Sequence, residues 1–315
     1  MARLFIEIMK YLLVFDSLRL NNSLGFTVKE NVTNTLTRRG DKFTFLTNDD
    51  YDAVIAGSGE DLFAKYSSLK PNKPIYVFAD ADSNDVAINT RGKENNIILS
   101  QTAFNYYQKA TKLLVAFDSQ IDFLKSHGIK TPIVRINLDP TFLKTDHLFD
   151  YERTAFRSFY QIPLDDQLIV SYGSYSDKKE FSALESIAGV SPDKEYIFFG
   201  HNDREFVKMK MMERLVKADN IKYLETMPEE LYHSALLNID ALLFTQKFIP
   251  YPNIIIDAIY YKIPIIAYHT DSLPRVINEK TALVPKDFQG LYDALKNIKT
   301  NNKSEAAYNL LFPKK

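Results

Sequence analysis

The stretch Pro250-Tyr-Pro-Asn-Ile-Ile-Ile-Asp-Ala-Ile-Tyr-Tyr-Lys-Ile-Pro-Ile-Ile-Ala267 predicts a turn, a short helix and a buried strand in direct succession. The helix is expected over Ile254–Tyr261, after a turn that contains two prolines. Ile265–Tyr268 is a continuous apolar run of strand length, which is typical of a strand buried on both faces. This order of elements is the repeating unit of an α/β fold.

The same alternation extends outward through the chain. In the N-terminal half the expected strands are Tyr11–Phe15, Phe43–Leu46, Ala53–Ala56, Ile75–Phe78, Lys112–Ala116 and Ile133–Ile136, with a helix over Val28–Arg39 that Gly40 ends. After the polar stretch Lys144–Arg157 the expected strands are Leu168–Tyr172, Tyr196–Phe199, Lys222–Leu224 and Ala241–Phe244. The pattern predicts two Rossmann-like, doubly wound domains, residues 1–145 and 146–315. In such domains ligands bind at the carboxyl ends of the strands.

The composition is that of an ordinary globular protein. Of 315 residues, 45% are hydrophobic and 25% charged, and 39 Lys and Arg balance 40 Asp and Glu. A net charge of -1 gives no general attraction to nucleic acid or to an anionic membrane. The absence of cysteine excludes disulfides and thiolate metal sites and is compatible with a cytoplasmic setting. Met1–Phe15 is apolar but short and interrupted by Glu7 and Lys10, so we expect neither a signal peptide nor a membrane span there.

Several segments, taken in order, resemble family 4 glycosyltransferases, which have the GT-B fold. The opening stretch resembles the donor-site segment of that family, which reads Glu, Gly-Phe-Pro-Asn, an apolar run, Glu-Ala and Gly-x-Pro-Val-Ile-Ala. The first glutamate falls on Ile249 and the second on Asp257. Further matching segments are Gly25–Val32, Lys109–Ser119, Phe123–Ile129, Pro132–Asp139, Phe159–Pro163, Gly173–Lys179, Met227–Tyr232 and Asn238–Phe244. Among members, bacterial glycolipid glucosyltransferases are the most similar in the order of segments.

The resemblance implies roles at a diphosphate-binding site. In the family an Arg and a Lys after the first strand of the second domain neutralise the leaving group. Here the Lys is Lys179, the Arg is replaced by Ser174, and Lys178 is a candidate substitute. The alternative is that both lysines are solvated loop residues. Gly25 is expected in a turn that lets the backbone approach the diphosphate, or in a simple strand-to-helix turn.

The donor segment implies contacts with the rest of the nucleotide sugar. Asp257 stands where a glutamate grips the ribose hydroxyls, the alternative being a carboxylate on the helix surface. Ile249 cannot make the sugar contact of the first glutamate. The amides of Tyr251 and Asn253 are expected to bind phosphate or sugar oxygens, since they precede a helix.

Other polar residues follow the expected strands. Asp80 and Asp82, with Asp85, are candidate acceptor-site carboxylates; as a metal loop they lack the glycine and distal glutamate of an EF-hand. We therefore expect no metal. His201 and also His269 are candidates for contact with the donor, or ordinary loop histidines.

The sequence leaves two functions open. In the first, the protein is a hexosyltransferase that moves a sugar, with a UDP-sugar as the expected donor, to a glycolipid, polysaccharide or glycoprotein hydroxyl; the resemblance implies retention at the anomeric carbon and no cofactor. In the second, it has lost transfer and is a nucleotide-binding protein or a subunit for a protein partner. The basic helix expected at Arg204–Lys217 suits either peripheral contact with the inner face of a membrane or a solvated surface.

Overall fold

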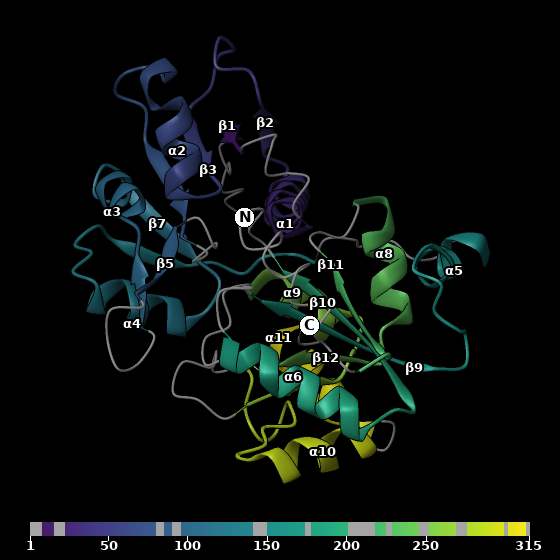
Figure 1. Ribbon diagram of the computed structural model, residues 1–315. Coiled ribbons are helices and arrows are strands. Elements are labelled where there is room, and N and C mark those ends of the chain that lie inside the picture. The colour runs from purple at the N-terminus through teal and green to yellow at the C-terminus, as the bar shows by residue number, and fades with distance from the viewer. Residues whose placement is uncertain are drawn as a thin grey trace. The chain divides into compact units, whose positions relative to one another are not determined.

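The computed structural model divides the chain into two compact units, with the division between Thr141 and Phe142 (Figure 1). It describes residues 8–15, 23–79, 85–89, 96–140, 150–173, 178–200, 218–224, 229–245, 252–268, 276–298 and 302–312. Each unit is built on a parallel sheet with its own apolar core.

The sheet of the first unit has the strand order β2-β1-β3-β4-β7-β8, and all its pairs are parallel. Its strands are β1 (Lys10–Val14), β2 (Lys42–Thr44), β3 (Ala53–Ala56), β4 (Ile75–Phe78), β7 (Lys112–Val115) and β8 (Ile133–Arg135). Its helices are α1 (Ser23–Arg39), α2 (Gly59–Lys65), the 3-10 turn η1 (Tyr66–Ser68), α3 (Gln101–Tyr107) and α4 (Asp118–Ser126). A separate antiparallel hairpin of β5 (Val86–Asn89) and β6 (Asn96–Leu99), which the sequence analysis did not predict, precedes α3.

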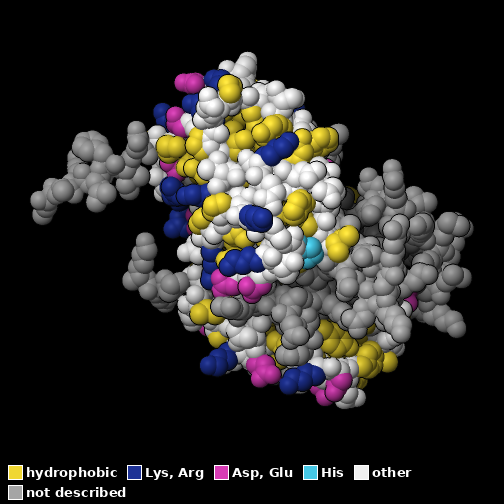
Figure 2. Space-filling model, turned by 90° about the vertical axis from the view of Figure 1, so that its left-hand side faces the viewer, with side chains coloured by type: hydrophobic (Ala, Val, Ile, Leu, Met, Phe, Trp, Pro, Cys, Tyr) yellow, Lys and Arg dark blue, Asp and Glu magenta, His cyan; other side chains and the backbone are white. Residues whose placement is uncertain are grey.

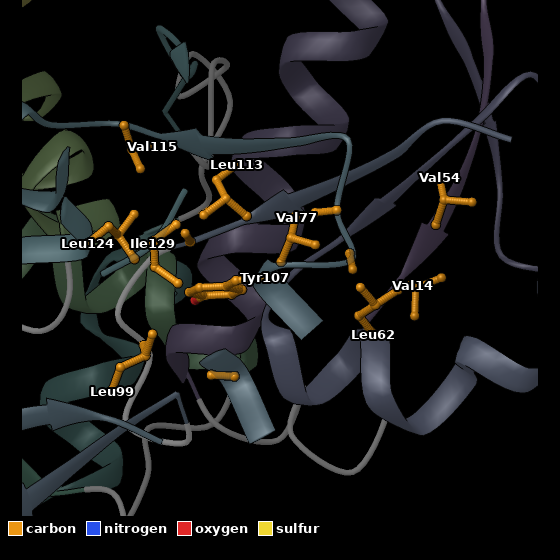
Figure 3. Close-up of a cluster of buried hydrophobic side chains, with 14 of the residues drawn as sticks. Val14, Val54, Leu62, Val77, Leu99, Tyr107, Leu113, Val115, Leu124 and Ile129 are labelled. Atoms are coloured by element: carbon orange, nitrogen blue, oxygen red, sulfur yellow. The ribbon is translucent and has the colours of Figure 1, made fainter. Parts of the chain in front are cut away.

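The core of the first unit lies between the sheet and α2 to α4. Figure 3 shows the Tyr107 ring among Val77, Leu113 and Ile129, which come from two strands and the turn after α4. Tyr107 is fully buried, so its hydroxyl needs a partner inside the protein. Gly40 ends α1 with a φ of 79°, as its place in the sequence predicted.

The second unit is a five-stranded parallel sheet with the order β11-β10-β9-β12-β13. Its strands are β9 (Gln167–Gly173), β10 (Lys194–Gly200), β11 (Ile221–Leu224), β12 (Ala241–Phe244) and β13 (Ile265–Ala267). Its helices are α5 (Asp150–Phe159), α6 (Lys178–Val190), α8 (Glu229–Asn238), α9 (Pro252–Tyr260), α10 (Phe288–Lys296) and α11 (Lys303–Leu311). The two doubly wound sheets confirm the α/β class expected from the sequence.

A buried arginine ties the start of the second unit together. The Arg157 guanidinium, at the end of α5, donates to the carbonyls of Pro163 and Asp166 at 2.7 and 2.9 Å. It also donates to the Asn238 carbonyl at 3.0 Å and pairs with Asp240 at 3.4 Å. These carbonyls lie before β9 and at the end of α8, so one side chain joins three elements. The polar stretch after which the strand pattern restarts thus contains most of a helix that is built into the domain.

Candidate functional site

The connections between strands locate the binding edge of the second sheet. From β9 the chain proceeds outward to β10 and β11, then returns to place β12 on the other side of β9. The reversal makes the gap beyond the carboxyl ends of β9 and β12 the topological switch point. Doubly wound sheets bind their ligands at this point because the connections that leave the two neighbouring strands run in opposite directions along the sheet.

Two helices begin at this switch point, and they carry the residues that the sequence singled out. Helix α6 follows β9 and starts at Lys178 and Lys179, whereas α9 follows β12 and starts at Pro252 and Asn253. The first four amides of a helix have no partner within it, and the helix dipole makes that end positive. Pro252 lacks an N–H and suits the first helical position. The switch point is therefore suited to an anion.

Asp257 lies in the second turn of α9 and is fully buried. The Tyr232 hydroxyl of α8 donates to its Oδ2 at 2.8 Å. The alternative of a carboxylate on the helix surface is therefore wrong. A buried carboxylate held by a tyrosine has a fixed orientation, which a bound diol requires of its acceptor.

The rest of α9 is apolar and buried on nearly all sides. Ile254, Ile255, Ile256 and Ile259 are each at most 3% exposed. Burial is the main cause that raises the pKa of Tyr261 well above its usual value, and the negative charge of Asp257 adds to this effect. Burying a carboxylate costs free energy unless hydrogen bonds compensate for the lost water. The burial of Asp257 in this apolar helix therefore requires a structural or a functional reason.

The first sheet has its own switch point, between β1 and β3. In the chain, helix α1 follows β1 and helix α2 follows β3. Gly25 lies inside the first turn of α1, which starts at Ser23, so the turn expected to precede the helix is part of it. The backbone N–H of Gly25 is then among the four amides without a partner in the helix.

Asp85, one of the three candidate acceptor-site carboxylates, is fully buried and is bound to groups of the first unit. Its carboxylate accepts from the backbone N–H groups of Gly59 and Glu60 at 2.7 and 3.1 Å, and from the Tyr107 hydroxyl at 2.5 Å. Its carbonyl accepts from the backbone N–H of Ser100 at 2.7 Å. Asp85 thus joins the starts of α2 and α3 and caps the positive end of α2. These partners are distant in sequence, so the sequence alone did not predict this role for Asp85.

Several residues singled out in the sequence lie outside the described residues. They are Asp80, Asp82, Ser174, His201, Ile249, Tyr251 and His269, together with the helix expected at Arg204–Lys217. For Lys178, Lys179 and Asn253 the structure describes the backbone, which it places at the starts of α6 and α9. Tyr232 was not singled out from the sequence, although it lies in a segment that resembles family 4 glycosyltransferases.

Within the described residues, no group of three or more His, Asp or Glu side chains is arranged to hold a metal ion. Among those same parts of the chain, no helix is long and apolar enough to cross a membrane.

The architecture is similar to that of several solved glycosyltransferase structures. HepE from Anabaena, in complex with UDP and glucose, matches with a TM-score of 0.61 and 13% identity over 96% of this chain and 94% of HepE. A glycosyltransferase from Rickettsia africae matches with a TM-score of 0.59 and 12% identity over 97% of this chain and 93% of its own. Sucrose-phosphate synthase from Thermosynechococcus elongatus matches with a TM-score of 0.58 and 13% identity over 94% and 75% of the two chains.

These likenesses, with two doubly wound parallel sheets in succession, show that the chain has the GT-B fold. No family model and no curated protein matches its sequence. The likeness is therefore one of fold.

Proposed function

We propose that this protein transfers a hexose from a nucleotide sugar, a UDP-sugar in the first place, to a hydroxyl group of an acceptor. One observation carries the proposal. The helices that begin at the switch point of the second sheet, α6 and α9, are those that carry Lys178, Lys179, Asn253 and Asp257. HepE, whose fold is similar, was solved with UDP-glucose and with UDP and glucose.

The transfer breaks the bond between the anomeric carbon and the diphosphate and forms a bond from that carbon to the acceptor oxygen. Negative charge grows on the diphosphate as it leaves, and the acceptor hydroxyl gives up its proton. The lysines and open amides at the start of α6 are suited to stabilise this charge, since preorganised donors act most strongly where charge develops. Asp257 is assigned to the ribose, with Tyr232 holding its carboxylate in place.

The remaining assignments rest on the resemblance to family 4 glycosyltransferases and to glycolipid glucosyltransferases. They are retention at the anomeric carbon, a lipid-linked, polysaccharide or glycoprotein acceptor, and the absence of a cofactor. Asp80 and Asp82 follow β4 and are the candidates for contact with the acceptor; His201 and Tyr251 are further candidates for contact with the donor. A cytoplasmic protein with peripheral membrane contact fits these acceptors.

Calorimetric titration of the full chain with UDP, UDP-glucose and GDP-mannose tests the donor site. We expect one nucleotide to bind, and Lys179→Ala to weaken it at least about tenfold because one charge-assisted contact is lost. Lys296→Ala is the matched control, since Lys296 lies in the last turn of α10 and outside the switch-point helices. The lack of any binding at about millimolar nucleotide would refute the proposal.

Release of UDP from the donor, followed in the presence of candidate acceptors, separates the two functions that the sequence left open. Turnover that Lys179→Ala abolishes supports the enzyme. Binding without turnover for any acceptor supports a nucleotide-binding protein that has lost transfer.

A further inference from the structure

An open depression of about 580 Å³ lies on the first unit, at helices α2 and α3. It is lined by Phe63, Thr102, Asn105, Tyr106, Gln108 and Lys109. None of these residues belongs to the switch points. In Figure 2 the upper half of the visible face shows single lysine or arginine side chains among hydrophobic ones.

Aromatic rings form the apolar part of the depression. Phe63 is 55% exposed, although a phenylalanine is usually buried. Its ring meets that of Tyr106 edge-on, with 5.3 Å between centroids, and Tyr66 meets Tyr106 in the same way at 5.4 Å. The Lys109 ammonium lies over the Tyr106 and Tyr66 rings at 4.2 and 4.6 Å. The rings are held in place by one another, so ligand binding need not order them first.

Polar groups that both donate and accept border these rings. Asn105 and Gln108 carry amides, and Thr102 carries a hydroxyl. The Asn105 carbonyl accepts from the Gln101 amide at 3.0 Å, and the Gln108 amide donates to the Gly128 carbonyl at 3.5 Å, which leaves the Asn105 N–H groups and the Gln108 carbonyl for a ligand. The lining contains no carboxylate. A sugar ring has an apolar face of C–H groups and a rim of hydroxyls that donate and accept. Exposed rings beside amide groups match both of these surfaces.

The size of the depression favours a short ligand over a protein. Small-molecule sites commonly occupy about 300–1,000 Å³, a range that contains this volume. A stable protein interface needs about 800 Å² on each partner and an apolar centre. Four of the six lining residues have polar side chains: Thr102, Asn105, Gln108 and Lys109. The depression therefore lacks the apolar centre of a stable protein interface.

We infer that the depression between α2 and α3 binds a short segment of an oligosaccharide. The helices that carry the depression connect it to the first switch point, because α2 follows β3. Asp85 joins the starts of α2 and α3, and Phe63 follows Gly59 by four residues, about 6 Å along the helix axis. The depression therefore lies on the same two helices that Asp85 holds together. That the glycan is the acceptor chain rests on the proposed function, whereas the binding of sugar does not.

The test is titration of the full chain, without nucleotide, with maltotetraose, cellotetraose and a hyaluronan tetrasaccharide. The two neutral probes and the anionic one separate stacking from attraction to Lys109. We expect at least one to bind with a dissociation constant of about 1 mM or below. Phe63→Ala should weaken sugar binding about tenfold, because the loss of one aromatic contact weakens binding by roughly this factor. In saturation-transfer NMR the C–H protons of one sugar face should receive the strongest signal.

Phe159→Ala is the matched control, because Phe159 is 62% exposed at the end of α5 in the second unit. It should leave sugar binding unchanged, and both variants should keep the unfolding temperature of the unmodified protein. Binding of none of the three probes, or binding that Phe63→Ala does not alter, overturns the inference. Self-association that Phe63→Ala abolishes, with no sugar bound, overturns it in favour of a protein interface. Sugar binding without nucleotide binding would instead sustain the inference while the proposed function fails.

Discussion

Replacing Asp85 with alanine should destabilise the first unit more than a typical substitution does. The carboxylate is fully buried and accepts from two backbone amides of α2 and from the Tyr107 hydroxyl. Alanine leaves three donors without this partner at a site that water does not reach. The hairpin β5–β6 and the starts of α2 and α3 lose their shared attachment.

The magnitude follows from these contacts. An unsatisfied buried donor costs about 1–3 kcal/mol, and such costs within one network add incompletely. We therefore expect a loss of about 3–5 kcal/mol for Asp85→Ala, within the range for breaking a buried charged network. For a domain of this size each kcal/mol lowers the unfolding temperature by roughly 3 °C, so the shift is about 10–15 °C. Differential scanning calorimetry of the full chain measures it.

Two further variants divide the effect. Tyr107→Phe removes one donor and leaves the two amides bound to Asp85, so it should cost about 1–2 kcal/mol. Ser100→Ala, which removes the cap of α3 at the Ala103 amide, is the control and should cost about 1 kcal/mol. If Asp85→Ala costs no more than Ser100→Ala, the carboxylate does not join the two helices as argued here.

Three other predictions concern packing, a buried charge and pH. Gly59→Ala should cost about 1–3 kcal/mol, because its Cβ would lie 2.7 Å from the Ala103 Cα, whereas Gly189→Ala, with nothing within 4 Å, should raise the unfolding temperature. Arg157→Met should lower the free energy of unfolding, measured by urea denaturation, by at least about 3 kcal/mol, since it leaves carbonyls before β9 and at the end of α8 without their donor. A loss below about 1 kcal/mol would contradict that role. Burial raises the pKa of Glu185, so the folded state holds its proton more tightly than the unfolded state, and stability falls as the pH rises through the window between the two pKa values. Glu185→Gln should remove this fall, and equal pH profiles for the two proteins would contradict it.

The strands were predictable because parallel strands buried on both faces appear as continuous apolar runs. Ala53–Ala56, Ile75–Phe78 and Ala241–Phe244 have the expected bounds in the structure. The hairpin β5–β6 was missed because Val86–Asn89 is short and directly follows a stretch that contains three aspartates. Helix α5, which packs on α8, was missed because charged residues interrupt the apolar ones in its sequence. Local pattern fails where an element depends on contacts with distant residues.

The candidate site, too, was predictable from the sequence only in part. Its place follows from strand order, and strand order follows from alternation that the sequence contains. The partners of the buried carboxylates do not follow, because Tyr232 is 25 residues from Asp257 and Gly59 is 26 from Asp85. Only the folded chain shows that Tyr232 holds the first of these carboxylates and that the second joins two helices.

Under the proposed function, the departures from the family 4 pattern at Ser174 and Ile249 bear differently on binding and on transfer. The amides at the starts of α6 and α9 belong to the backbone, so a changed side chain leaves them in place. Affinity for a diphosphate can therefore persist without the family's arginine and first glutamate. Transfer depends on contacts that strengthen as charge develops, and each lost donor of this kind costs about 3 kcal/mol of activation free energy, or roughly a hundredfold in rate. If nucleotide binds and turnover is slow, the fold has kept the backbone part of the site while the side-chain part has changed.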